Sequence, residues 1–227
     1  MDRQAAVNLT SGLLTAPWQY ALWVLWVLTL LPLLRQAAWQ PLRQPARFNL
    51  WCAAIAVVFT LWCIRSGVRP GLSLHLLGAT ILTLMFGARL AQLALYGVVA
   101  AVTAAGMAGV DAYPANALLT GWLPVWLSYA LYRLADRRLP ANIFVFIFVA
   151  GFLSAALAMA ASAGAAVALH VATGTYTPGY LAEYYLPYAL LLAWGEAFIT
   201  GMVVSLMVAY YPQWVMLFDD ARYLARR

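Results

Sequence analysis

The chain has 227 residues, of which 66% are hydrophobic and only 9% are charged. Soluble domains carry about 25% charged residues, so this composition excludes a water-soluble domain and indicates a polytopic membrane protein. The net charge of +6 is the balance of thirteen arginines, no lysine and seven acidic residues. Because these arginines lie mainly between apolar segments and in the C-terminal tail, the charge gives no reason to expect a nucleic acid partner.

Seven apolar segments follow one another along the chain. A hydrocarbon core of about 30 Å needs about 20 residues of helix, so we expect an all-α integral membrane protein with seven transmembrane helices in a single domain, residues 1–227. The third segment is short, and we expect it to begin as a loop or a tilted entry. The segments are residues 17–34, 48–64, 72–86, 90–108, 115–134, 143–171 and 187–210.

The arginines give these segments a direction. Ten of the thirteen fall on one side of the seven-segment pattern, and Arg3, Arg65 and Arg69 fall on the other. Cytoplasmic loops carry an excess of arginine and lysine, so we expect the N-terminus outside, the C-terminus inside and a multi-pass location in the bacterial inner membrane. The ten are Arg35, Arg43, Arg47, Arg89, Arg133, Arg137, Arg138, Arg222, Arg226 and Arg227.

With this orientation, several of the few reactive polar residues lie near the outer face. His75 opens the third segment, Asp111 and Asn116 flank the turn into the fifth, and His170 ends the sixth. Glu196 lies about ten residues into the last segment, near mid-membrane. A carboxylate at that depth costs several kcal/mol, so it should face a partner, a cavity or a substrate path, or be capped by neighbouring helix ends.

These side chains suit a metal ion as a substrate. Imidazole, carboxylate and amide groups together match a borderline divalent ion such as zinc, nickel or cobalt, although two histidines cannot build a histidine-rich site. We expect no tightly bound cofactor. The absence of lysine excludes a retinal or pyridoxal Schiff base, and no Walker-type glycine loop is present. The chain is therefore not expected to be an enzyme, and any ATP hydrolysis would belong to separate subunits.

Three stretches carry a resemblance to a known family. They are Ser73-Leu74-His75-Leu76-Leu77-Gly78 with Phe86-Gly87, then Pro114-Ala115-Asn116-Ala117 with Pro124 and Tyr129, and finally Glu196 with Gly201 and Tyr211-Pro212-Gln213-Trp214. Together they resemble the substrate-binding membrane component of cobalt and nickel energy-coupling factor transporters, the CbiM/NikM family, over nearly the full chain. The resemblance implies seven spans, His75 as a metal ligand, and partners consisting of a transmembrane coupling protein and cytoplasmic ATPases.

The N-terminus departs from the family pattern. The family begins with a methionine and a histidine that chelate the metal, whereas here the stretch Gly12-Leu13-Leu14-Thr15-Ala16-Pro17 follows a longer N-terminal segment. Counting back from this stretch places Asn8 where the family has its histidine. An amide in place of an imidazole removes a strong nitrogen donor. Three alternatives follow for this chain: it binds a different ion, it binds the same ion more weakly, or its substrate has changed.

The leading hypothesis is a permease subunit that imports a divalent transition-metal cation. It would bind the ion at His75, with Asn8, Asp111, Asn116, His170 and Glu196 as candidate substrate-binding residues. The alternative is a non-transporting inner-membrane assembly or regulatory protein on the same fold. A third hypothesis is a cytochrome-like bundle in which His75 and His170 are axial haem ligands.

Overall fold

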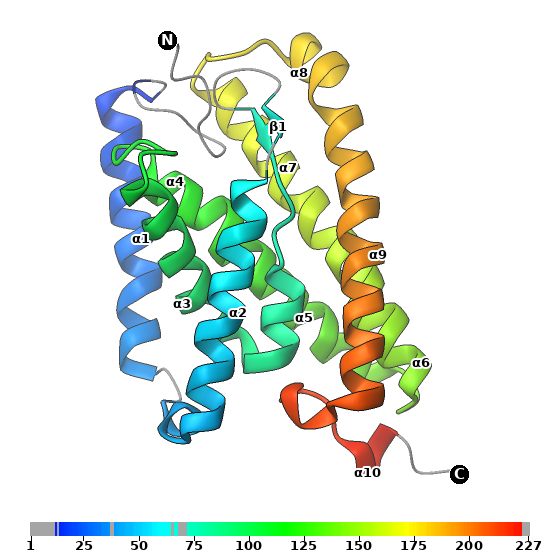
Figure 1. Ribbon diagram of the computed structural model, residues 1–227. Coiled ribbons are helices and arrows are strands. Elements are labelled where there is room, and N and C mark those ends of the chain that lie inside the picture. The colour runs from blue at the N-terminus through cyan, green and yellow to red at the C-terminus, as the bar shows by residue number, and fades with distance from the viewer. Residues whose placement is uncertain (1–11, 13, 37–38, 65, 68–71, 224–227) are drawn as a thin grey trace.

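The computed structural model describes the chain except for residues 1–11, 13, 37–38, 65, 68–71 and 224–227. The described part is predominantly helical, and its long helices form one bundle (Figure 1). Two runs, residues 113–138 and 143–172, are helical without interruption and contain wide π-helical turns, η2 and η3. The helical elements are α1 (Ala16–Gln36), η1 (Gln40–Arg43), α2 (Pro45–Cys63), α3 (Ala79–Ala104), α4 (Tyr113–Asn116), η2 (Ala117–Trp122), α5 (Leu123–Arg138), α6 (Ile143–Val145), η3 (Phe146–Leu153), α7 (Ser154–Ala172), α8 (Pro178–Tyr184), α9 (Leu186–Tyr210), η4 (Pro212–Trp214) and α10 (Asp220–Tyr223).

Five helices of the described chain are long and apolar enough to cross a membrane. They are Ala16–Arg35, Pro45–Cys63, Ala79–Ala104, Ile143–Ala172 and Leu186–Tyr210. The expected count of seven is therefore not confirmed. The expected third segment is not helical before Ala79, and the expected fifth lies in the run of α4, η2 and α5, which ends in a charged turn.

Helix α3 is broken at Gly87, which has φ 76° and ψ 163°. This backbone conformation is essentially restricted to glycine. Before the break, the chain lies beside Trp62, near the end of α2. The indole of Trp62 donates a hydrogen bond to the carbonyl oxygen of Leu77. After the break it lies beside Trp51 near the start of α2, whose indole donates to the carbonyl oxygen of Leu90. The expected third and fourth segments thus meet at Gly87.

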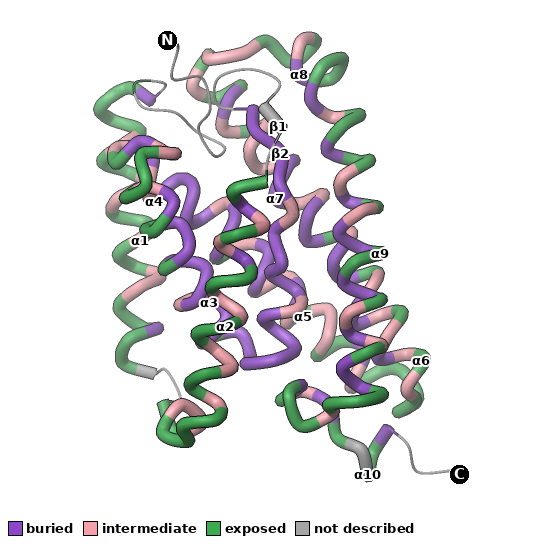
Figure 2. The backbone as a smooth tube through the Cα atoms, viewed as in Figure 1, coloured by how far each residue is buried: buried purple, intermediate pink, exposed green. Residues whose placement is uncertain are grey.

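The core of the bundle is centred on α3. This helix packs against α2, α5, α7 and α9 and is buried along most of its length (Figure 2). In contrast, α2 buries only Val58 and Trp62, and the described part of α1 buries only Leu33. Helices that are apolar on their exposed faces match a hydrocarbon environment, where the backbone polar groups must be satisfied within the helix.

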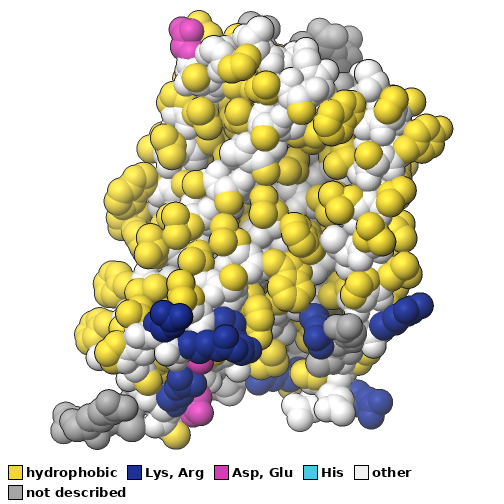
Figure 3. All heavy atoms as spheres, turned by 180° about the vertical axis from the view of Figure 1, so that it is seen from behind, with side chains coloured by type: hydrophobic (Ala, Val, Ile, Leu, Met, Phe, Trp, Pro, Cys, Tyr) yellow, Lys and Arg dark blue, Asp and Glu magenta, His cyan; other side chains and the backbone are white. Residues whose placement is uncertain are grey.

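The arginines of the described chain gather at one end of the bundle, which we call the arginine end (Figure 3). They lie at the end of α1, in η1, at the start of α2, beside the break in α3, in the last turns of α5 and in α10. These residues are Arg35, Arg43, Arg47, Arg89, Arg133, Arg137, Arg138 and Arg222. These eight are the described members of the ten arginines that the sequence assigns to one side.

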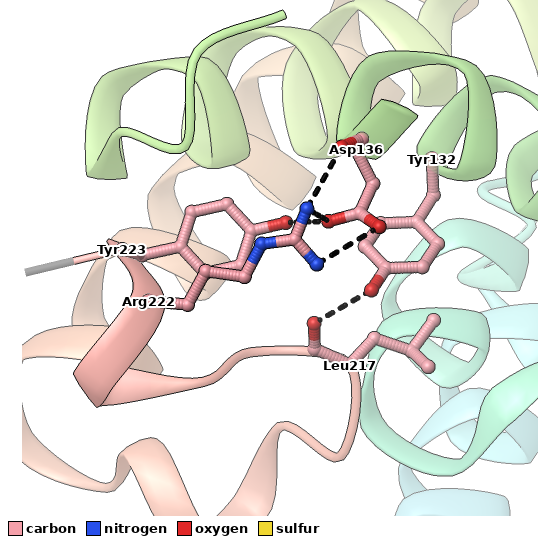
Figure 4. Close-up of polar contacts among 5 residues, drawn as sticks. All are labelled: Tyr132, Asp136, Leu217, Arg222 and Tyr223. Atoms are coloured by element: carbon pink, nitrogen blue, oxygen red, sulfur yellow. Dashed lines mark hydrogen bonds and ion pairs between the residues drawn. The ribbon is translucent and has the colours of Figure 1, made fainter. Parts of the chain in front are cut away.

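A cluster of polar contacts at the arginine end, the C-terminal clamp, joins α10 to α5 (Figure 4). The carboxylate of Asp136 accepts a hydrogen bond of 2.7 Å from the hydroxyl of Tyr223 and pairs with Arg222 at 3.0 Å. The hydroxyl of Tyr132 donates to the carbonyl oxygen of Leu217 at 3.0 Å. The clamp holds the chain that follows α9 against the base of the bundle.

The chain that follows α9 also contacts the broken helix. The amides of Met216 and Leu217 donate to the carbonyl oxygens of Met85 and Leu84, at 3.2 and 3.1 Å. Those carbonyls belong to the last turn before Gly87, where the helix cannot supply its own donors. The C-terminal segment therefore satisfies carbonyl groups at the C-terminal end of the short helical section 79–86.

Candidate metal site around His75

His75 lies on a short extended segment that leads into α3. The segment begins with strand β2 (Ser73–Leu74), which pairs antiparallel with β1 (Ser66–Gly67) and brings Ser66 opposite Leu74. It ends at Gly78, which has φ 67° and precedes the first residue of α3. A side chain at Gly78 would place its Cβ 3.1 Å from Val58, so glycine meets both the backbone and the packing requirement.

The imidazole of His75 is buried, and its ring lies against the indole of Trp62 with 4.3 Å between ring centroids. Its Nδ1 is 3.1 Å from the carbonyl oxygen of Leu76. Because a carbonyl oxygen only accepts, this contact favours the tautomer with hydrogen on Nδ1. In that neutral tautomer Nε2 carries the lone pair, which is the form of histidine that binds metals.

A narrow cavity adjoins His75. Its volume of about 10 Å³ corresponds to roughly one water-sized sphere. Two of its hydroxyl groups already donate to backbone carbonyls, that of Thr120 to Asn116 and that of Ser162 to Leu119, both at 2.6 Å. Their oxygens therefore present lone pairs rather than protons. The cavity is lined by Ser73, Leu74, His75, Leu77, Leu119, Thr120, Met159, Ser162, Ala163, Ala166 and Tyr185.

Glu196 lies on α9 and reaches the same segment from the other side. It is buried, and its two carboxylate oxygens accept hydrogen bonds from the amides of Leu77 and Gly78, each at 2.8 Å. These contacts match the expectation that Glu196 is capped by a neighbouring helix end. Its carboxyl group accepts from the amides at the start of a helix.

The other predicted residues are placed apart from the cavity wall. The carboxylate of Asp111 accepts a hydrogen bond of 2.9 Å from the amide of Gly12. Asn116 is completely buried one turn before Thr120. His170 is buried near the end of α7, with its ring against Tyr176 at 5.3 Å. Asn8 lies outside the described residues, so its predicted role stays a prediction.

Among the residues that the structure describes, no group of three or more histidine, cysteine or acidic side chains is close enough to hold a metal ion. His75 is the one predicted ligand among the described residues that line the cavity. The sequence did not single out Thr120, Met159, Ser162 or Tyr185, because such residues are common in helix packing. The run of small residues between 154 and 166 was the available signal, since small side chains allow helices to approach closely.

Solved structures share this fold. One, described as the crystal structure of a truncated transition metal transporter, aligns with a TM-score of 0.70 and 20% identity, covering 90% of this chain and 99% of that chain. A second, described as the crystal structure of a transition metal transporter, has a TM-score of 0.69 and 18% identity, covering 89% and 93%. At this level of identity the likeness shows a common fold, a bundle of helices.

The family profile described as "Cobalt uptake substrate-specific transmembrane region" matches residues 8–214. The chain therefore belongs to this family, and it is a component of a metal-uptake transporter. A comparison with curated proteins found no match. The resemblance that rested on three short stretches is thus confirmed over nearly the whole chain.

Proposed function

We propose that the chain is the substrate-specific membrane component of an importer for a divalent transition-metal cation, and that His75 binds the ion. The observation that carries this proposal is the buried imidazole beside a cavity of single-ion size, with its Nδ1 3.1 Å from the carbonyl oxygen of Leu76. Imidazole favours zinc, nickel, cobalt and related ions over magnesium or calcium. The ion is the cargo of the protein, and we propose no tightly bound cofactor.

One imidazole does not complete a coordination sphere. Hydroxyl oxygens of Thr120 and Ser162 and the thioether of Met159 lie in the same wall, and we propose Asn8 of the N-terminal segment as a further donor. A site with one imidazole and several neutral oxygen ligands binds a borderline ion less tightly than a nitrogen-rich chelate. We therefore expect weaker binding than a site with a second imidazole would give.

We further propose seven membrane crossings, with the N-terminus outside and the C-terminus inside. The break at Gly87 supports this number, because it divides α3 into one section that approaches the arginine end and one that leaves it. The arginine end supports the direction, because positive residues favour the cytoplasmic side. In this orientation residues 72–78 lie nearer the outer face, where an incoming cation arrives. We propose that the membrane is a bacterial inner membrane.

Transport against a gradient needs an energy source that this chain has no motif to provide. Its sequence contains no phosphate-binding glycine loop. We propose that a separate transmembrane coupling protein and cytoplasmic ATPases supply the energy, and that they meet the chain from the side of the arginine end.

Metal-dependent stabilisation tests this function directly. The purified protein is heated with cobalt, nickel, zinc or manganese at about 100 times the dissociation constant, where binding should stabilise it by about 2.7 kcal/mol. We expect His75→Ala to abolish the effect and His170→Ala, a matched change of the other histidine, to retain it. If none of the four ions stabilises the wild-type protein, the alternative of an assembly or regulatory protein is favoured.

A further inference from the structure

The segment that carries His75 is anchored by a residue that lies 119 positions after Leu77. Both oxygens of the Glu196 carboxylate are used, one for the amide of Leu77 and one for that of Gly78. The two hydrogen bonds are equally short, at 2.8 Å, and the side chain of Glu196 is buried. A carboxylate that receives two consecutive amides restrains both the position and the rotation of the peptide between them.

These two amides need an acceptor from outside the helix. They lie just before Ala79, so α3 contains no carbonyl that could accept from them. In the interior of a membrane protein, an unsatisfied backbone amide is strongly unfavourable. The carboxyl group of Glu196 offers one acceptor oxygen to each of the two amides. Glu196 therefore supplies two hydrogen-bonding restraints on the backbone that leads from His75 into α3.

Restraint of this backbone also restrains His75. The imidazole is two residues before Leu77, and its ring packs on Trp62, whose indole donates to the carbonyl oxygen of the same Leu77. Trp62 and Glu196 thus both hold the backbone of Leu77, Trp62 through its carbonyl oxygen and Glu196 through its amide. Without the carboxylate, the longer hydrogen bond of 3.3 Å from Trp62 remains.

We infer that Glu196 is a positioning residue of the metal site, which presets the His75 imidazole for the cation by binding the amides of Leu77 and Gly78. This inference rests on the proposed function, in which His75 binds the cargo. It assigns Glu196 a role through the backbone, because each of its oxygens accepts from one of the two amides and Glu196 is not among the described residues that line the cavity.

The fold should tolerate a change at Glu196. The C-terminal end of the helical section 79–86 is held by the amides of Met216 and Leu217, without any contribution from Glu196. Strand β2 holds the upstream end of the segment through its pairing with β1. Loss of the carboxylate therefore loosens the middle of the segment, where His75 lies, and leaves both ends in place.

The test is Glu196→Gln in the full chain, with Glu183→Gln on the exposed surface of α8 as the matched control. The glutamine keeps the size of the side chain but has one acceptor oxygen and directs an N–H group at an amide. We expect cobalt binding, measured by titration, to weaken by about 10–100-fold, the usual effect of losing a group that orients a ligand. We expect Glu183→Gln to bind like the wild type, and both variants to remain folded without metal.

The outcomes are distinguishable. If Glu196→Gln binds cobalt like the control while His75→Ala loses binding, the positioning role is wrong and the proposed function stands. If the wild type itself binds no cobalt, nickel, zinc or manganese, the proposed function fails first. If Glu196→Gln does not fold, Glu196→Asp is tested instead, because it retains the carboxyl group. We expect its affinity for cobalt to lie between that of the wild type and the affinity weakened by about 10–100-fold that is expected for Glu196→Gln. If neither variant folds without metal, Glu196 serves stability alone and the inference is overturned.

Discussion

Replacing Gly87 by alanine should destabilise the protein, because the break in α3 requires glycine. The backbone there has φ 76° and ψ 163°, and a residue with a Cβ pays about 1–3 kcal/mol in such a conformation. The new Cβ would also lie 2.8 Å from the terminal methyl group of Met216. That methyl is at the end of a flexible side chain, so its displacement adds little to the cost.

Gly97 provides the matched control in the same helix. It is exposed, has no heavy atom within 4 Å of a built Cβ, and lies in the regular part of α3. Alanine there should stabilise the helix by about 0.5–1 kcal/mol. For a chain of this size each kcal/mol corresponds to about 2–4 °C. Thermal unfolding in detergent should therefore show a Tm about 2–12 °C lower for Gly87→Ala and about 1–4 °C higher for Gly97→Ala. Equal shifts of the two variants would refute the reasoning.

Three further outcomes follow from the contacts. Asp136→Asn should lower the free energy of unfolding by about 1–2 kcal/mol, measured by thermal unfolding, because it weakens the charge-assisted hydrogen bond from Tyr223. The ion pair with the half-exposed Arg222 contributes little to this loss. Burial and the neighbouring Asp136 raise the pKa of Tyr223. The contribution of its hydroxyl to the stability of the fold is therefore present below the unfolded pKa of about 10 and is lost as the pH rises further. Tyr223→Phe should remove that part of the loss of stability at alkaline pH. Cobalt at His75 should quench the fluorescence of Trp62, and the quenching should shrink in Trp62→Phe.

Much of the architecture can be predicted from the sequence. Apolar segments of sufficient length identify the helices, and the spacing of arginines identifies the end where they gather. Three short stretches, around His75, Asn116 and Glu196, together indicate the family. These features are encoded locally, either in composition over about 20 residues or in a few consecutive side chains.

Features that depend on distant contacts could not be predicted in the same way. The sequence places Gly87 between the segments 72–86 and 90–108 but does not reveal its positive φ, so the continuity of α3 across the break was not expected. Glu196 meets Leu77 only after the chain has folded, and its sequence neighbourhood does not distinguish a ligand from a cap. Likewise, Thr120 and Ser162 line the cavity because two helices bring them together, whereas hydroxyl side chains occur on many helix faces.

The central claim is that His75 binds the transported cation, and the location of a bound metal tests it most directly. Crystals of the cobalt-loaded protein, measured at the cobalt absorption edge, would give an anomalous difference map. We predict one strong peak bonded to the imidazole of His75, inside the cavity that Thr120 and Ser162 line. A strong peak bonded to other side chains, with none at His75, would contradict the account.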